Sequence, residues 1–381
     1  MHPTAEKASG VLTEKLILKN NNTARYGSRL FITLSLVCTG LWPLAAQAGH
    51  TTKASSKAGA KTAASKTATN AAPAFSTSPD VQQFIVEMHE QHGFDIAHLT
   101  RQFAAIHSNA TVLRAIRPAA VPEQQRSWER YRARFVNERR INNGLVFWQE
   151  NAAELARAEA IYGVPAEIIA AIIGVETEYG RNMGKFSVLE ALATLAFDYP
   201  PRAPFFRSEL EQFLLLAREN GISPLEIKGS YAGAIGIPQF MPSSQRRFAV
   251  DFDGDDRIDL RQSTSDAIGS VARYFVMNGW QTKAPVAAPA RVEGDPTPLI
   301  AAGIKPALPL KELARQGVIA TGDPDRPAAL IDLVTPNQAT EYWIGFDNFY
   351  AITRYNRSSF YAMSVFQLAE ALREERLKNA P

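Results

Sequence analysis

The chain has 381 residues, of which 46% are apolar and 21% charged, and its formal net charge is +3. This length and composition predict a soluble globular protein of two or three domain-sized units. The charge is unevenly spread, with +3 in residues 1–48, +4 in residues 49–79 and −4 in residues 80–381. The part expected to fold is therefore mildly acidic, so nucleic acid is not an expected partner.

The N-terminus has the pattern of an export signal. Arg25 and Arg29 precede an apolar run over residues 30–46, and Ala46-Gln47-Ala48 offers small residues for cleavage. The alternative is an uncleaved membrane anchor, but the run is short and contains Pro43. We therefore predict a signal peptide over residues 1–48 and a periplasmic protein.

The single cysteine, Cys38, lies within that signal, and the residues before it do not resemble a lipoprotein box. A mature chain without cysteine needs no disulfides. Residues 49–79 consist mostly of Ala, Lys, Ser and Thr and lack apolar bulk, which predicts a disordered linker. We expect a soluble or loosely wall-associated protein.

From Asp80 onward, apolar residues recur at helical spacing, and no strand-like alternation appears before about residue 285. The first large unit is therefore predicted to be α-helical. One helix is predicted to begin at Asp80, a second to run from His98 to His107, and a third to follow the apolar stripe from Trp128 to about Asn142-Asn143-Gly144. Three more helices are predicted at Phe147 to Tyr162, Ser187 to Phe197 and Arg207 to Glu219.

The segment from Tyr162 to Gly184 carries the strongest chemical signal. Pro165 suits the first turn of a helix and Gly180 suits its end. Glu176 lies on the same face as the apolar Ile172 and Ile173. Apolar surroundings raise the pKa of a carboxyl group, so Glu176 is the candidate proton donor.

A second carboxylate, the usual partner in glycoside chemistry, is harder to find. Glu178 is turned off the face of Glu176, and we expect it to pair with Arg181 on the surface. The six histidines are scattered and give little support for a triad or a zinc site. Either a distant carboxylate completes the site, or one glutamate works with help from an N-acetylated sugar.

Residues 229–244 are rich in Gly, Pro and small polar residues, with Tyr and Phe between them. This pattern predicts an irregular loop with aromatic walls, a common place for a binding site on a helical scaffold. Amides such as Gln239 and Asn356 could hold sugar hydroxyl or acetamido groups.

Residues 251–262 resemble the frame of an EF-hand calcium loop. The expected oxygen ligands are Asp251, Asp253, Asp255, the carbonyl of Arg257 and Asp259. Asp256 replaces the usual glycine and Gln262 the usual bidentate glutamate, so the alternative is an acidic turn that caps the next helix.

Residues from about 285 to 340 are richer in Pro, Val and small residues. Short strands are predicted at Ala287 to Val292 and at Ala328 to Val334. We therefore expect a small β-containing insertion, followed by a last helix that ends near Leu377.

Four of these segments occur in the order seen in one enzyme family: Gly174 to Gly180, Ser230 to Ser244, the loop 251–262 and Tyr355 to Ser358. From about residue 80 to 378 the chain closely resembles membrane-bound lytic murein transglycosylase B and its soluble relatives. The resemblance implies a mainly α fold, with a lysozyme-like helical core, an additional α-domain and a small inserted β-domain. It also implies non-hydrolytic cleavage of the β-1,4 bond between N-acetylmuramic acid and N-acetylglucosamine in peptidoglycan, leaving a 1,6-anhydromuramoyl end.

The resemblance further implies roles for single residues. Glu176 matches the single acid/base, Ser230 and Gln239 match loop residues near it, and Asn356 matches a cleft asparagine. The remaining matches are the cleft tyrosines Tyr131, Tyr274, Tyr355 and Tyr361 and the calcium ligands Asp251, Asp253, Asp255, Arg257 and Asp259. Tyr131 and Tyr274 could instead be core residues, and Ser230 a turn cap.

No cofactor is expected for the chemistry, with calcium as a structural ion. The expected partner is the glycan strand of peptidoglycan, with other cell-wall enzymes as further candidates and a monomer as the expected state. Two alternative functions remain open: a hydrolytic muramidase, and a catalytically inactive scaffold that binds the wall.

Overall fold

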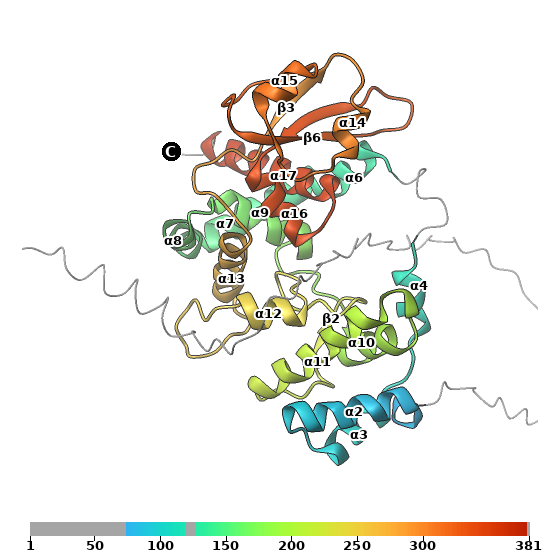
Figure 1. Ribbon diagram of the computed structural model, residues 1–381. Coiled ribbons are helices and arrows are strands. Elements are labelled where there is room, and N and C mark those ends of the chain that lie inside the picture. The colour runs from blue at the N-terminus through green and yellow to red at the C-terminus, as the bar shows by residue number, and fades with distance from the viewer. Residues whose placement is uncertain (1–73, 119–125, 379–381) are drawn as a thin grey trace, which may run out of the picture.

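The computed structural model describes residues 74–118 and 126–378 (Figure 1). The expected signal peptide and residues 49–73 of the expected 49–79 linker lie outside these residues. The folded region starts earlier than expected from the sequence, because the short 3-10 helix η1 (Phe75–Thr77) precedes Asp80 and its Phe75 is buried in the core. The linker boundary at residue 79 therefore moves toward the N-terminus.

The first helical lobe, at the bottom of Figure 1, is built from two separate stretches of chain. They share one apolar core, which includes Phe84, Phe103, Leu192 and Phe213. The elements are α2 (Pro79–His92), α3 (Ile96–Ala104), α4 (Ala110–Ile116), α10 (Val188–Phe197), η2 (Pro200–Arg202) and α11 (Ala203–Glu219).

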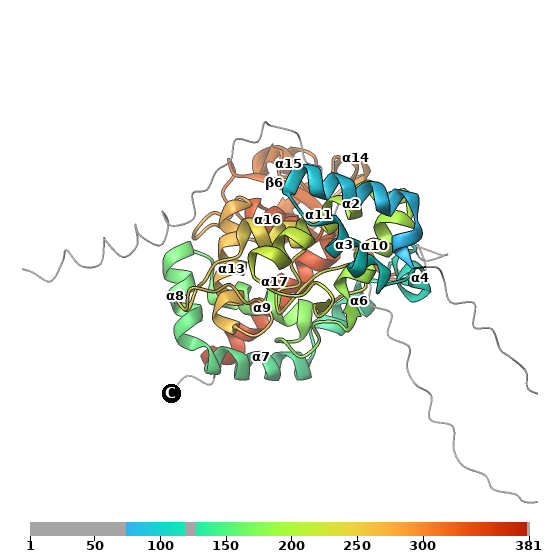
Figure 2. The same ribbon diagram turned by 90° about the horizontal axis from the view of Figure 1, so that it is seen from below.

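The central lobe surrounds α9 (Ala166–Thr177), whose residues are nearly all buried. Four helices pack against α9, namely α7 (Glu138–Glu150), α8 (Ala152–Tyr162), α13 (Thr264–Met277) and α17 (Ser359–Lys378), and Figure 2 shows it in their midst. The lobe is completed by α6 (Trp128–Phe135), α12 (Pro242–Phe248) and α16 (Asp347–Tyr355).

A small sheet unit lies between α13 and α16 in the chain. Its strands are β3 (Ala287–Val292), β4 (Leu308–Pro309), β5 (Val318–Ala320), β6 (Pro327–Leu333) and β7 (Glu341–Gly345). All neighbours are antiparallel, in the order β4-β6-β7-β3-β5, with Leu330 opposite Ile344. The helices α14 (Thr297–Ala301) and α15 (Leu310–Arg315) complete the unit, which has its own apolar core.

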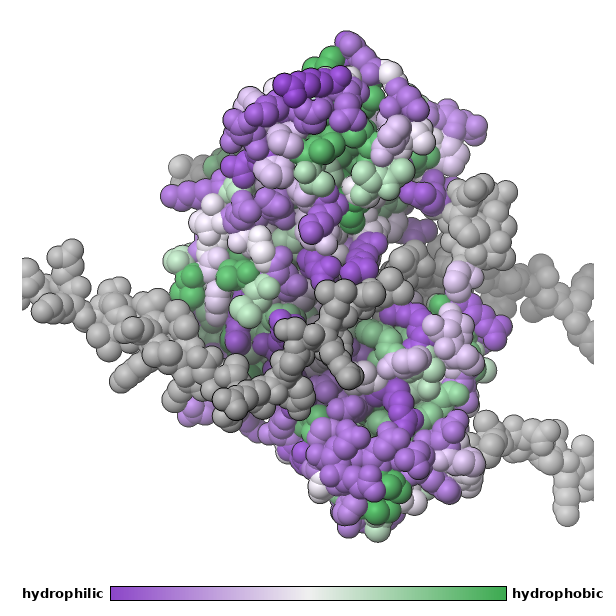
Figure 3. Space-filling view, in the orientation of Figure 1, coloured by the Kyte–Doolittle hydropathy of each residue, from purple (hydrophilic) through white to green (hydrophobic). Residues whose placement is uncertain are grey.

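The sheet unit confirms the predicted β-containing insertion, and both predicted strands correspond to β3 and β6. Apolar residues gather on the face of this unit that Figure 3 presents, whereas the outer side of the first helical lobe is mostly polar. A mainly α fold with a small sheet is confirmed.

The prediction of one helix from Trp128 to about Gly144 was wrong, because the chain breaks at Asn137. The Asn137 side chain accepts a hydrogen bond from the Arg140 N–H (3.0 Å) and donates one to the carbonyl of Ala133 (3.0 Å), so it closes α6 and starts α7. Gly144 does not end a helix. It lies inside α7, where a Cβ atom would stand 2.3 Å from Tyr179 Oη.

Helix α9 ends at Thr177, three residues before the predicted end at Gly180. Glu178 and Tyr179 follow with φ of 51° and 63°, the left-handed region that non-glycine residues rarely adopt. Beyond them, β1 (Phe186–Ser187) pairs with β2 (Lys228–Gly229). These two-residue strands are too short to leave an alternating pattern in the sequence.

None of the helices in the described residues is by itself both long and apolar enough to cross a membrane. The pair α8 and α9 passes that test together, by length and composition only, and is bent by 116° at its break.

Candidate active site

Glu176 lies in the last turn of α9, partly exposed at the end of an otherwise buried helix. The Tyr361 hydroxyl donates a hydrogen bond to its Oε1 (2.5 Å). Burial raises the pKa of Glu176 from 4.5 to about 7, although the hydrogen bond from Tyr361 acts in the opposite direction. The geometry agrees with the interpretation of an apolar-face carboxyl group, which can hold its proton near neutral pH.

Tyrosines gather around this carboxyl group. The rings of Tyr355 and Tyr361 are stacked, with centroids 6.5 Å apart, and Tyr274 meets Tyr355 edge-on at 4.8 Å. The Tyr274 hydroxyl donates to the carbonyl of Arg354 (2.5 Å). Burial, and then the nearby charge of Glu176, raise the pKa values of Tyr355 and Tyr361 well above the usual range, so both phenols stay protonated donors.

Tyr131 belongs to the same neighbourhood. It is half-buried on α6 and packs against Phe135 (5.1 Å between centroids) and Phe360 (5.7 Å). A negative charge on the Tyr131 phenolate would raise the pKa of the Tyr361 hydroxyl. The structure therefore brings all four predicted tyrosines to one region beside Glu176.

The loop 229–244 is bound to the end of α9 through Thr177. The Thr177 hydroxyl donates to the carbonyl of Ile237 (2.8 Å), and Tyr355 donates to the carbonyl of Pro238. Gln239 has φ of 52°, and its Nε2 donates to the carbonyls of Gly236 (2.8 Å) and Met183 (3.1 Å). The amide of Gln239 is thus fixed in direction by the loop itself.

Ser230 closes the first turn of this loop. Its Oγ accepts hydrogen bonds from the N–H groups of Ala234 (3.0 Å) and Ala232 (3.3 Å). In the described part of the chain, no direct hydrogen bond joins Ser230 or Gln239 to Glu176. Ser230 therefore makes the hydrogen bonds of a turn cap, as the alternative interpretation expects.

Asn356 follows α16, directly after Tyr355, and is buried. Its Oδ1 has no hydrogen-bond partner among the described residues. A buried amide oxygen without a donor carries a desolvation cost, so such an atom suits a donor supplied by a bound molecule.

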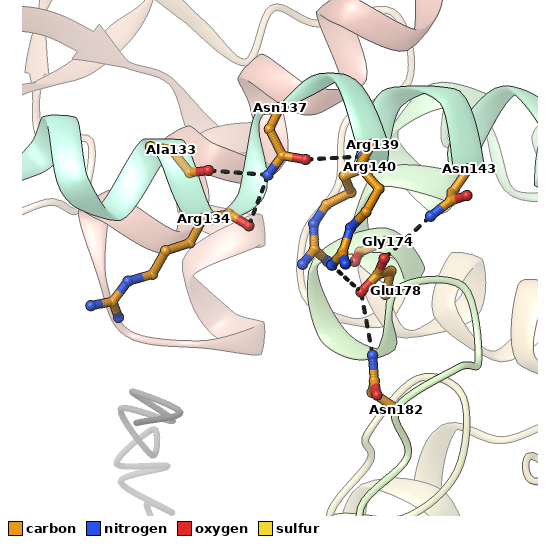
Figure 4. Close-up of polar contacts among 9 residues, drawn as sticks. All are labelled: Ala133, Arg134, Asn137, Arg139, Arg140, Asn143, Gly174, Glu178 and Asn182. Atoms are coloured by element: carbon orange, nitrogen blue, oxygen red, sulfur yellow. Dashed lines mark hydrogen bonds and ion pairs between the residues drawn. The ribbon is translucent and has the colours of Figure 1, made fainter. Parts of the chain in front are cut away.

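The expectation that Glu178 pairs with Arg181 on the surface was wrong. Glu178 is only 8% exposed, and its carboxylate points toward α7 (Figure 4). It accepts hydrogen bonds from Arg139 Nη2 (2.9 Å), Asn143 Nδ2 (3.2 Å) and Asn182 Nδ2 (3.3 Å). Sequence spacing missed these partners because the left-handed turn at 178 and 179 redirects the side chain.

The loop 251–262 gathers three of its predicted ligands. One carboxylate oxygen from each of Asp251, Asp253 and Asp255 lies within 4.8 Å of the others. Asp256 takes φ of 64°, the conformation for which calcium loops use glycine at this position. Three gathered carboxylates and this turn fit a hard divalent cation.

Asp259 is not part of that group. Its Oδ1 accepts from the Arg261 N–H (2.9 Å) and lies 3.4 Å from Arg261 Nε. The loop is also fastened to α13, since Asp253 accepts a hydrogen bond from the Ser263 hydroxyl (2.6 Å). The fold therefore assembles only part of the predicted ligand set.

Comparisons with known proteins identify the family. The sequence profile of the transglycosylase SLT domain matches residues 76–370. Membrane-bound lytic murein transglycosylase B of Escherichia coli K12 is 43% identical over 321 residues, which cover 78% of this chain and 84% of that protein.

Two solved structures extend this likeness to the fold. Soluble lytic transglycosylase SltB1 from Pseudomonas aeruginosa is 47% identical with a TM-score of 0.73, over 78% of this chain and 99% of that one. Escherichia coli lytic transglycosylase Slt35, in complex with calcium, is 42% identical with a TM-score of 0.71, over 81% and 96%. The lysozyme-like helical fold is thereby confirmed, and the chain belongs to the lytic murein transglycosylases that carry the transglycosylase SLT domain.

Proposed function

We propose that this protein cleaves peptidoglycan strands non-hydrolytically, with Glu176 as the single acid and base. The observation that carries the proposal is the Glu176 carboxyl group at the end of the buried helix α9, hydrogen-bonded to the Tyr361 hydroxyl, where burial raises its pKa to about 7. No carboxylate is among the groups that shift the pKa of Glu176 in the described residues. Glu178, its neighbour in sequence, is turned away to α7.

In the first step, protonated Glu176 gives its proton to the glycosidic oxygen as the bond between that oxygen and C1 of N-acetylmuramic acid breaks. The acetamido carbonyl of the same sugar stabilises the positive charge that develops at C1. The Tyr361 hydroxyl, which donates to Oε1, stabilises the carboxylate that is left.

In the second step, the C6 hydroxyl of the same sugar attacks C1 and gives its proton to the Glu176 carboxylate. A bond between O6 and C1 forms, so the product ends in 1,6-anhydromuramic acid and Glu176 is protonated again. No water enters the reaction, and no cofactor is needed for either step.

The glycan strand would lie against the tyrosine cluster, whose rings can stack on the C–H faces of sugars. The free Oδ1 of Asn356 supports a hydrogen bond to a sugar hydroxyl or amide N–H. Gln239 and Ser230 would line the same strand from the loop 229–244. We propose that the chain acts as a monomer in the periplasm after export, with other cell-wall enzymes as further partners.

We also propose that calcium binds to the loop 251–262 as a structural ion. The gathered carboxylates of Asp251, Asp253 and Asp255 support this site. Bound calcium would fasten the loop beside α13 and would take no part in bond cleavage. Asp259 and the carbonyl of Arg257 would complete the ligands after a small rearrangement.

Digestion of purified sacculi tests the reaction. Anhydromuropeptides are lighter than the products of hydrolysis by one water, so mass spectrometry separates a lyase from a muramidase. Only reducing ends would refute the lyase proposal. Glu176→Gln should release no muropeptides, and if neither form cleaved the wall, the binding-scaffold alternative would be favoured.

A further inference from the structure

Three successive residues at the end of α9 contact three different parts of the central lobe. Glu176 accepts a hydrogen bond from Tyr361 on α17, and Thr177 donates one to Ile237 in the loop 229–244. Glu178 contacts α7. The direction of the Glu176 side chain is therefore set by a backbone that is held on both sides.

The contact with α7 is the most extensive of the three. The buried carboxylate of Glu178 receives donors from Arg139 and Asn143 of α7 and from Asn182 (Figure 4). Arg140 of the same helix donates to the carbonyl of Gly174, one turn earlier on α9. Helix α7 thus holds the last turn of α9 from outside the tyrosine cluster.

These contacts hold a strained backbone. Glu178 and Tyr179 have positive φ values of 51° and 63°, which cost energy for residues with a Cβ atom. Tyr179 is wedged between α7 and α9, where a Cβ atom on Gly144 or Gly174 would lie 2.3 Å or 2.6 Å from its Oη. Without the ligands of the Glu178 carboxylate, the end of α9 can relax toward ordinary backbone angles.

We infer that Glu178 is a positioning residue: held by Arg139, Asn143 and Asn182, it fixes the end of α9 and thereby directs the Glu176 carboxyl group toward Tyr361. This inference rests on the proposed role of Glu176 as the acid and base. Glu178 does not exchange a proton with the substrate.

The test compares Glu178→Gln with Glu176→Gln and with Glu209→Gln as a matched control. Glu209 is also a buried carboxylate, and it accepts hydrogen bonds from the N–H (2.9 Å) and hydroxyl (2.6 Å) of Ser243. It lies on α11, whose apolar residues belong to the core of the first helical lobe. Both substitutions replace a buried, hydrogen-bonded carboxyl group by an amide, but only Glu178 stands at the end of α9 and contacts α7.

For Glu178→Gln we expect kcat to fall about tenfold to a hundredfold while KM changes little, since a small misplacement of a reacting group costs that much. Glu209→Gln should keep the wild-type kcat. If Glu178→Gln keeps the wild-type kcat, or if Glu209→Gln loses as much, the inference is refuted.

The pH profile supplies a readout that general destabilisation would not move. If the Glu176 carboxyl group swings toward water, its pKa falls back toward 4.5, and the alkaline limb of kcat shifts to lower pH. An alkaline limb that stays in place would contradict the inference. The Glu176 carboxyl group is hydrogen-bonded to Tyr361, and its charge reaches Tyr355 and Tyr274. The Glu178 carboxylate bonds to Arg139, and its charge reaches Arg140 and Tyr179.

Arg139→Met keeps the inference testable should Glu178→Gln fold poorly, because the Arg139 side chain is 74% exposed. Arg139→Met should lower kcat by a smaller factor than Glu178→Gln does, and Arg139→Lys should lose less kcat than Arg139→Met. Adding Arg139→Met to Glu178→Gln should change kcat no further, whereas additive losses would contradict the inference. If Glu176→Gln remained active, the proposed function itself would fail, whatever the Glu178 variants do.

Discussion

Replacing Glu176 by glutamine should abolish activity and, at neutral and alkaline pH, stabilise the folded protein. The folded state raises the pKa of Glu176 from 4.5 to about 7, so it holds the proton more tightly than the unfolded chain does. The contribution of this group to stability is therefore full below about pH 4.5 and is lost as the pH rises to about 7. Glutamine resembles the protonated form and can still accept the hydrogen bond from Tyr361, but it does not ionise.

The size of the effect follows from the same two values. A rise from 4.5 to about 7 corresponds to about 3 kcal/mol, because one pKa unit is worth about 1.4 kcal/mol. Wild type and Glu176→Gln should thus have similar free energies of unfolding near pH 4.5 and should differ by up to about 3 kcal/mol at pH 8. Urea unfolding followed by circular dichroism across this pH range measures the difference.

Glu178→Gln serves as the contrast in that experiment, because it breaks an ion pair and should destabilise the protein at pH 8. A stability gap between wild type and Glu176→Gln that is the same at pH 5 and pH 8 would refute the reasoning, since it would mean that Glu176 ionises as an ordinary carboxyl group.

Three further predictions concern other parts of the molecule. Tyr361→Phe removes a hydrogen bond that lowers the pKa of Glu176, so the alkaline limb of the pH–rate profile should move to higher pH. An unchanged limb would mean that the Tyr361 hydroxyl does not act on the pKa of the catalytic acid. Calcium at a hundred times its Kd should stabilise wild type by about 2.7 kcal/mol, and Asp253→Asn should reduce the calcium-dependent rise in melting temperature; an equal rise in both would place the ion elsewhere. Gly144→Ala should lower the urea concentration at the midpoint of unfolding. Overpacking against Tyr179 Oη and Leu372 costs about 1–3 kcal/mol, which outweighs the roughly 1 kcal/mol gained in helix propensity. A raised midpoint would show that Tyr179 can move aside without an energetic cost.

Features that leave a periodic pattern or a biased composition in the sequence could be predicted from it. The apolar face that carries Glu176, the small strands at β3 and β6, and the acidic spacing of the loop 251–262 all left local patterns. The resemblance to a known family added the four tyrosines, whose convergence from α6, α13, α16 and α17 no local pattern could indicate. These residues meet only because the helices pack around α9.

Features set by backbone angles or by distant partners were missed. The positive φ at Glu178 turned a supposed surface carboxylate into a buried one, and its partner Arg139 lies on a different helix. Asn137 starts α7 in the middle of a sequence pattern that predicts one unbroken helix. Gly144 resembles a glycine that ends a helix, although it lies within α7 and makes room for Tyr179. For Glu178 and Gly144 the decisive neighbour is remote in sequence, whereas Asn137 breaks the helix through its near neighbours Ala133 and Arg140.

The first helical lobe has a consequence for how the chain folds. Helices α2 to α4 share their core with α10 and α11, which follow only after the whole stretch from α6 to α9. Contacts between segments so far apart in sequence close large loops and slow folding relative to proteins with local contacts. In a newly made chain the apolar faces of the N-terminal helices therefore stay uncovered until α10 and α11 have been synthesised, and until then they are exposed to aggregation and to proteases.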